Sequence, residues 1–369
     1  MIRVRAGNTY AIPFVVNLGQ RNACIINGHL TPLRRLFPKT VAFTVIPRTY
    51  DLIHSMNAIP LFTRTPFIVT FEDWMPRTPP DIRSEMLQWL LSKRIAKDQC
   101  VALLAMSRYA RNQMSYQHRR SPLLDTLLKK TEVLYPAVAL GDHRPKQLGE
   151  KLRLLFVGAD FMRKGLPALL IAHNELERSG IPVETTVVSS LRWHARDYVG
   201  PSSQKLVEDQ RNQLRQSTVK LVGQLPNDAV LDLMRNSDFL VLPTFHDTFG
   251  FAALEAMVRG TPVIASHTCA LPEMIEDGHN GLLLPFDNDV LGRWRWLYRP
   301  QTDDYTAAYE SECAKLGATL VARLTDAWEA PRYYEAMSAE ALLTIETKFN
   351  KLHVRDRLEA LYERAIQTA

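Results

Sequence analysis

Short apolar runs alternate with helical patterns along the C-terminal half of the chain. The runs Leu152–Gly158 and Phe239–Pro243 stop at glycine or proline and predict strands that are buried on both faces. Apolar residues at helical spacing predict helices over Leu166–Arg178 and Phe251–Arg259, the second ending at Gly260. This alternation with short connections predicts a doubly wound α/β domain with a mainly parallel sheet. Further strands are expected at Pro182–Ser190, Val219–Gly223, Pro262–Ala265 and Gly281–Pro285, and further helices at Glu208–Gln216 and Asn227–Met234.

The N-terminal half follows the same pattern of strands and helices. Gly141, Asp142, Pro145 and Gly149 are typical of a linker, and Tyr333–Ile366 predicts a long final helix. We therefore expect two α/β domains: residues 1–142 with a final crossing helix at about 347–369, and residues 150–345. The expected strands are Ala11–Val16, Val41–Ile46, Leu52–His54, Phe67–Phe71, Val101–Met106 and Thr131–Tyr135, and the expected helices are Arg83–Ile95 and Arg108–Gln117.

Composition narrows the class of protein. Of the 369 residues, 46% are hydrophobic and 23% are charged, as in ordinary globular proteins. No apolar run approaches the roughly 18 residues of a membrane span, and no secretory signal is recognisable. The four cysteines form no C-x-x-C pair, which excludes a zinc ribbon and argues against a disulfide framework. These features predict a cytoplasmic protein with reduced thiols.

Charge is distributed unevenly. Residues 1–140 carry 19 lysine and arginine residues against 8 acidic ones, a net charge of +11, whereas the remainder has a net charge of −5. This asymmetry indicates an anionic partner for the first half, either a phospholipid surface, a nucleic acid or an acidic substrate. A generally basic, solvated surface is the alternative. No nucleic-acid recognition motif or basic–aromatic stripe is present, so a nucleic-acid partner is not expected.

Candidate chemistry concentrates between residues 243 and 285. A predicted strand ends at Pro243, and a polar loop leads through Phe249 and Gly250 into a helix, whose first backbone N–H groups form an anion site. Asp247 and Glu255 lie eight residues apart and could each accept hydrogen bonds from neighbouring sugar hydroxyls. The alternatives are a helix-capping role for Asp247 and a surface position for Glu255.

This stretch resembles a family motif. Asp247-Thr-Phe-Gly-Phe-Ala-Ala-Leu-Glu255-Ala-Met-Val-Arg-Gly-Thr-Pro-Val-Ile-Ala-Ser266 resembles the acid-x7-Glu signature of retaining GT-B glycosyltransferases of the glycosyl transferases group 1 type, which is family 4-like. Aspartate stands where the family usually has the first glutamate. The continuation 271–285 also matches, and Phe156-Val-Gly-Ala-Asp-Phe-Met-Arg-Lys-Gly165 resembles the family's diphosphate loop.

The resemblance implies a fold and a donor site. The fold would be the GT-B architecture, in which two Rossmann-like doubly wound domains face each other across a cleft and a C-terminal helix crosses back to the first. Arg163 and Lys164 would stabilise the departing diphosphate, Glu255 would hold the donor ribose, and Asp247 would hold hydroxyls of the hexose. The other expected donor-binding residues are Gly158, Thr248, Phe249, Gly250 and Phe251.

Weaker matches lie in the N-terminal half. Tyr50–His54 and Phe67–Asp73 resemble two strands of the family's acceptor domain, with Glu72 where relatives carry a histidine. The resemblance therefore implies His54, Glu72 and Asp73 on the acceptor side. The alternatives are a buried, hydrogen-bonded histidine at position 54 and ordinary loop carboxylates at positions 72 and 73.

The implied activity is transfer of a hexose, with retention, from a UDP-, GDP- or ADP-sugar to an acceptor hydroxyl on a lipid or cell-envelope polysaccharide. No His/Asp cluster is recognisable in the sequence, so we expect neither a metal nor a cofactor. The basic N-terminal domain predicts peripheral binding to the inner face of an anionic membrane. The alternative is a catalytically inactive scaffold that binds a nucleotide sugar.

Overall fold

The computed structural model describes residues 2–6, 23–27, 43–45, 50–77, 85–194, 199–299 and 301–367. The chain divides into two compact units. The first comprises Met1–Ala139 with Phe349–Ala369, and the second comprises Leu140–Lys348. Each unit contains a six-stranded parallel sheet with helices packed on it, which confirms the predicted α/β class.

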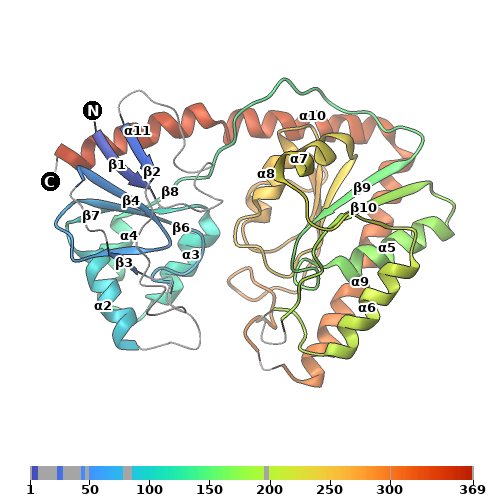
Figure 1. The fold of residues 1–369 in the computed structure, drawn as a ribbon, viewed down its shortest axis with the longest axis horizontal. Helices are drawn as coiled ribbons and strands as arrows, with labels where there is room; N and C mark the ends of the chain where they lie inside the picture. The colour runs from blue at the N-terminus through green and yellow to red at the C-terminus, as the bar shows by residue number, and fades with distance from the viewer. Residues whose placement is uncertain are drawn as a thin grey trace. The chain divides into compact units, whose positions relative to one another are not determined.

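The sheet of the first unit has the strand order β2-β1-β4-β6-β7-β8. Its strands are β1 (Ile2–Ala6), β2 (Ala23–Asn27), β4 (Leu52–Met56), β6 (Phe67–Phe71), β7 (Cys100–Ala105) and β8 (Thr131–Val133), and β3 (Phe43–Val45) pairs separately with β5 (Ile59–Leu61). Side chains alternate between the two faces along β4 and β6. Ile53 and Phe67 pack with helices α2 (Glu85–Ala96), α3 (Arg108–Gln117) and α4 (Leu124–Lys129). Leu52 and Ile68 pack with the final helix α11 (Lys351–Gln367) on the other face (Figure 1).

The sheet of the second unit has the order β11-β10-β9-β12-β13-β14. Numbered within the unit this is 3-2-1-4-5-6, the order of Rossmann folds. The strands are parallel, and the order in which they are added to the sheet reverses between the first and the fourth strand. The reversal therefore lies between β9 and β12. The strands are β9 (Leu152–Val157), β10 (Val183–Val188), β11 (Lys220–Leu221), β12 (Phe239–Leu242), β13 (Val263–Ser266) and β14 (Gly281–Leu284).

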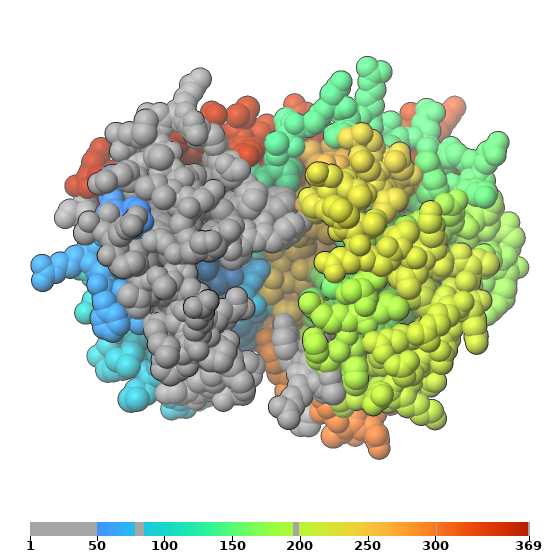
Figure 2. Space-filling view, viewed as in Figure 1, coloured from blue at the N-terminus to red at the C-terminus, as the bar shows by residue number. Residues whose placement is uncertain are grey.

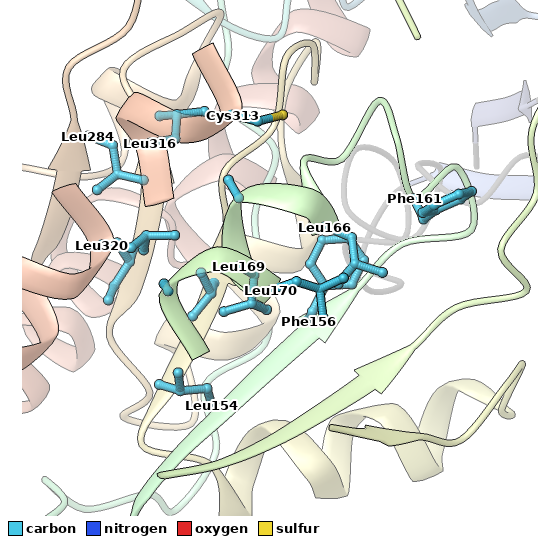
Figure 3. Close-up of a cluster of buried hydrophobic side chains, with 14 of the residues drawn as sticks. Leu154, Phe156, Phe161, Leu166, Leu169, Leu170, Leu284, Cys313, Leu316 and Leu320 are labelled. Atoms are coloured by element: carbon cyan, nitrogen blue, oxygen red, sulfur yellow. The ribbon is translucent and has the colours of Figure 1, made fainter. Parts of the chain in front are cut away.

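One large apolar cluster supports this sheet. Leu169 and Leu170 of α5 (Leu166–Arg178) lie between Phe156 of β9 and Leu316 of α9 (Asp303–Glu329), as Figure 3 shows. Helices α7 (Asn227–Asn236) and α8 (Phe251–Met257) contact β9 and β13. Figure 2 shows α7 with α6 (Gln204–Gln216) forming much of this unit's surface on the face viewed. A short 3-10 turn covers Leu271–Glu273.

The predicted long helix over Tyr333–Ile366 is wrong, because two helices occupy this segment. Helix α10 (Pro331–Lys348) ends before Phe349, and α11 begins at Lys351. The Phe349 carbonyl accepts from the Val138 N–H (3.0 Å), and the Lys351 N–H donates to the Val138 carbonyl (3.1 Å). Val138 thus forms hydrogen bonds with the Phe349 carbonyl and the Lys351 N–H, two groups that would bond within the helix if it were continuous.

Other boundaries also differ. Helix α9 was not predicted, nor were β1 and β2, whereas the expected strand Ala11–Val16 lies outside the described residues. The expected helix Phe251–Arg259 ends two residues earlier, at Met257, where a turn closes on Gly260 with φ 68°. Among the described residues, no helix combines the length and the apolar character that a membrane span requires.

Candidate functional site

Two loops meet at the reversal point of the second sheet. One follows β9 and contains Gly158–Gly165, and the other follows β12 and leads from Pro243 into α8. β9 and β12 are neighbouring parallel strands, so both loops leave the same edge of the sheet. Ligands of open α/β sheets bind at such a point. The topology therefore brings the two sequence motifs together.

Gly165 allows the loops to approach closely. Its φ is 77°, in the left-handed region, and a Cβ atom there would lie 1.8 Å from the Pro243 carbonyl oxygen. No side chain fits this space, and only glycine adopts this backbone conformation readily. The Phe245 N–H then donates to the Arg163 carbonyl (2.9 Å). The two loops are consequently a single hydrogen-bonded structure.

The two predicted diphosphate ligands lie against the second loop. Arg163 donates from one guanidinium nitrogen to the His246 carbonyl (2.9 Å), and Lys164 Nζ forms a short ion pair with Asp247 Oδ2. The side chains of Lys164 and Asp247 remain 15% and 18% exposed. Burial raises the pKa of Asp247, but the adjacent Lys164 and Arg163 outweigh it, so the pKa lies below its usual value. Asp247 is therefore an anion held among cations, at a position that a ligand can reach.

Asp160 and Arg192 belong to the same cluster, although neither was among the residues predicted for the site. Asp160 accepts from Arg163 (2.9 Å) and, through both oxygens, from Arg192 at 2.6 and 2.9 Å. The hydrogen bonds from Arg192, with those from Arg163, lower the pKa of Asp160 to about 2. Arg192 follows β10, far from Asp160 in sequence, so only the sheet order brings them together.

Most of the remaining predicted residues lie at or near the start of α8. Gly250 has φ 90° and precedes the first helical residue, Phe251, whose ring lies 5.1 Å from that of Phe249. Phe249 and Glu255 are buried, whereas Thr248 and Phe251 are half-buried. The Glu255 carbonyl accepts from Arg259 (2.7 Å). Gly158 is half-buried at the start of the first loop, where a Cβ would lie 2.8 Å from Lys164 Cγ.

Helix α9 supports the first loop from behind. Tyr309 donates from its hydroxyl to the Met162 carbonyl (2.7 Å) and stacks on Phe245 with ring centroids 4.4 Å apart. Trp294 packs against Phe245 as well, at 4.8 Å. Aromatic contacts of this kind hold the loops in one conformation. The apolar spacing of Tyr305, Tyr309, Cys313, Leu316 and Leu320 was the available signal for α9.

In the first unit, His54 is a buried residue. Its Nδ1 lies 2.6 Å from the Tyr362 hydroxyl of α11, and its Nε2 lies 2.7 Å from the Thr70 hydroxyl. Burial lowers the pKa of His54 to about 3, so the ring is neutral, with one nitrogen donating and the other accepting. This geometry favours the buried-histidine alternative, while contact with an acceptor stays a prediction.

Glu72 and Asp73 follow strand β6. Glu72 Oε1 accepts from Arg77 (2.6 Å) and from the Asn57 amide (3.1 Å), and the Glu72 N–H donates to Asn57 Oδ1 (3.3 Å). Asp73 is buried. The contacts of Glu72 fix it just after the carboxyl end of β6, and an acceptor role stays a prediction for Glu72 and Asp73. Within the described ranges, no group of three or more histidine, cysteine and acidic side chains is arranged to hold a metal ion. Metal independence likewise stays a prediction.

Comparison with known proteins agrees with the resemblance of the motifs. Residues 142–290 match the family described as Glycosyl transferases group 1. An uncharacterized 41.2 kDa protein in the cps region of Klebsiella pneumoniae is 28% identical over 169 residues, which are 43% of this chain and 42% of the relative. A D-inositol 3-phosphate glycosyltransferase of Streptomyces bingchenggensis is 43% identical over 61 residues, covering 16% of this chain and 13% of the relative. The matched segments thus span less than half the length of these relatives.

Solved structures share the fold. Anabaena Alr3699/HepE in complex with UDP aligns with a TM-score of 0.65 at 15% identity, over 99% of this chain and 100% of that one. Sucrose-phosphate synthase from Thermosynechococcus elongatus aligns with a TM-score of 0.58 at 16% identity, over 87% and 75% of the two chains. Both likenesses concern the fold, which is the GT-B architecture of glycosyltransferases. The segment 142–290 is thus similar to the glycosyl transferases group 1 family.

Proposed function

We propose that this protein transfers a hexose from a nucleotide-diphosphate sugar to an acceptor hydroxyl, with retention of configuration. The observation that carries the proposal is the cluster at the reversal point of the second sheet. There Arg163 contacts the His246 carbonyl and Lys164 pairs with Asp247, in the loop that leads into α8. Partly exposed cations beside a carboxylate are suited to a ligand that has both phosphate oxygens and hydroxyls.

Each residue has a role in this proposal. Arg163 and Lys164 stabilise negative charge on the departing diphosphate, because fixed cations favour the charge that develops as the glycosidic bond breaks. Asp247 exchanges part of its contact with Lys164 for hydrogen bonds to hexose hydroxyls. Glu255 accepts from the ribose hydroxyls. The amides of Phe249, Gly250 and Phe251 bind a phosphate oxygen, with Gly158 and Thr248 lining the same site.

No protein base is needed in this scheme. The acceptor attacks the face from which the diphosphate departs, and a donor phosphate oxygen takes the acceptor's proton. We also propose that neither a metal ion nor a cofactor takes part. Anabaena Alr3699/HepE, which shares the fold, has been solved with UDP-glucose. A uridine donor is therefore the first of the UDP-, GDP- and ADP-sugars to test.

We propose a lipid or envelope-polysaccharide acceptor. Its candidate contacts in the first unit are Glu72 and Asp73, which follow a strand end as expected for binding groups of a parallel sheet. His54 contributes less to this role, since both of its ring nitrogens are engaged inside the unit.

The test is thermal unfolding with a panel of nucleoside diphosphates and nucleotide sugars. We expect one base family to raise the melting temperature of the wild type, and Glu255→Gln to lose that increase. Glu346→Gln, an exposed change on α10 of the same unit, is the matched control. Donor hydrolysis or transfer is then assayed with the nucleotide so identified. Binding without turnover with any acceptor would favour the inactive-scaffold alternative, and no shift with any nucleotide would contradict the donor site itself.

A further inference from the structure

Helix α2 exposes apolar side chains along one side. Met86, Trp89 and Leu90 are spaced by three and four residues and are 70%, 50% and 50% exposed. The opposite side of the helix, with Leu91 and Ile95, is buried against the sheet. Single exposed apolar residues are ordinary, whereas several together mark an interaction surface.

Phe62 is a further exposed aromatic residue, in a loop that is hydrogen-bonded to α2. It lies in the loop after β5 with φ 53°, and its side chain is 92% exposed. Arg94 of α2 fixes this loop, donating to the carbonyls of Pro60 (3.0 Å) and Thr63 (2.8 Å). A bulky residue in the left-handed region is strained. Because the Phe62 ring is almost fully exposed, packing within the unit does not offset this strain, and a contact outside the protein would explain the conformation.

Basic groups frame the apolar residues. The Lys93 ammonium lies 3.6 Å from the centroid of the Trp89 ring. The exposed Lys97 directly follows the end of α2 at Ala96, and Arg64 is exposed two residues after Phe62. Acidic residues occur at the helix ends only, as Glu85 and Asp98. Lys130 fixes the end of the helix by donating to the carbonyls of Ala96 (2.9 Å) and Lys97 (2.7 Å). The surface is therefore rigid, apolar at its centre and basic at its edge.

We propose that this α2 surface, made of Phe62, Met86, Trp89, Leu90, Lys93 and Lys97, docks on an anionic phospholipid bilayer. The chemistry favours lipid because aromatic and aliphatic side chains enter the interfacial region while the lysine stems extend their ammonium groups to lipid phosphates. The net charge of +11 in residues 1–140 acts in the same direction. The docking itself does not depend on the proposed function. Only its purpose, to hold the transferase near a lipid-borne acceptor, rests on that function.

The test is flotation of the full chain with vesicles of phosphatidylcholine, with and without phosphatidylglycerol, in the absence of donor. We expect binding to the anionic vesicles alone, and a loss of about tenfold or more in Trp89→Gln/Leu90→Gln. Leu343→Gln, on α10 of the second unit, is the matched apolar control because Leu343 is 48% exposed. Lys93→Gln/Lys97→Gln should weaken binding by a similar factor, unlike the equally charge-reducing Lys205→Gln/Lys220→Gln.

Three outcomes would overturn the inference. They are a wild type that fails to float with anionic vesicles, α2 variants that float as well as the wild type, and α2 variants that instead dissociate a dimer in sedimentation. Thermal unfolding with nucleotides on the same preparations separates this inference from the proposed function. Retained nucleotide binding with lost flotation reports on the α2 surface alone, and the reverse result reports on the donor site alone.

Discussion

The polar cluster at the reversal point of the second unit differs in kind from the polar group inside the first. Around Arg163 and Lys164, the charged side chains remain partly exposed and are paired with carboxylates that a ligand can displace. Around His54, the groups are neutral and fully buried, and each ring nitrogen has a hydroxyl partner. Both groups lie on or next to strands of a parallel sheet, but only the side chains around Arg163 and Lys164 are exposed enough to contact a ligand. The second joins α11 to β4 and serves stability.

The largest expected effect concerns the close contact that builds the cluster. Gly165→Ala should destabilise the second unit by roughly 5 kcal/mol or more, because the new Cβ meets the Pro243 carbonyl at 1.8 Å. Gly180→Ala is the matched control, since Gly180 has the same φ of 77° and a Cβ added there would enter open space. It should cost only about 1 kcal/mol. Denaturant unfolding measures both, and equal losses would contradict the role of the contact.

The next effect tests the buried polar group of the first unit. The pKa of His54 is about 3 in the folded chain, below the ordinary value of 6.5. Below pH 6.5 the unfolded chain therefore binds more protons, so stability is complete above pH 6.5 and falls as the pH drops toward 3, by at most about 4–5 kcal/mol from this residue. His54→Gln should flatten the stability profile over that range.

Denaturant unfolding at a series of pH values measures this effect. Burial also lowers the pKa of His118 and His173, so part of the wild-type slope should remain in the variant. His279→Gln, at a half-exposed surface histidine, is the control and should leave the slope unchanged. An identical slope in His54→Gln and the wild type would mean that His54 is not a neutral buried group.

The smallest expected effect concerns Asp160, which holds Arg163 and Arg192 in the donor cluster. Asp160→Asn removes the charge that holds Arg163 and Arg192, and we expect about a tenfold fall in kcat with a change in stability of about 1 kcal/mol or less. The measurement is initial rates of transfer or donor hydrolysis together with thermal unfolding. Asp232→Asn, whose Arg235 partner lies at 3.9 Å on an exposed helix, is the control. Equal rates for the two variants would mean that Asp160 does not position Arg163.

The sequence predicted the sheet of the second unit well for a physical reason, although it missed helix α9 of the same unit. Strands such as β9 and β12 are buried on both faces and are therefore continuous apolar runs, and their ends are marked by Gly158 and Pro243. The first unit was harder to predict. The expected strand at Thr131–Tyr135 is only Thr131–Val133. In β1, Arg3 and Arg5 interrupt the apolar residues, so no continuous run marks this strand, and β2 was not predicted either.

The sequence by itself determined the α/β class, the resemblance to a glycosyltransferase family and the two loops that carry Arg163, Lys164, Asp247 and Glu255, because these depend on local periodicity and on contiguous motifs. Only the tertiary structure decided which side chains meet. The order of strands brings Arg192 to Asp160 and Lys164 to Asp247, and the return of α11 buries His54 against Tyr362. Such contacts join residues 32 to 308 positions apart, and no local pattern encodes a distance between them.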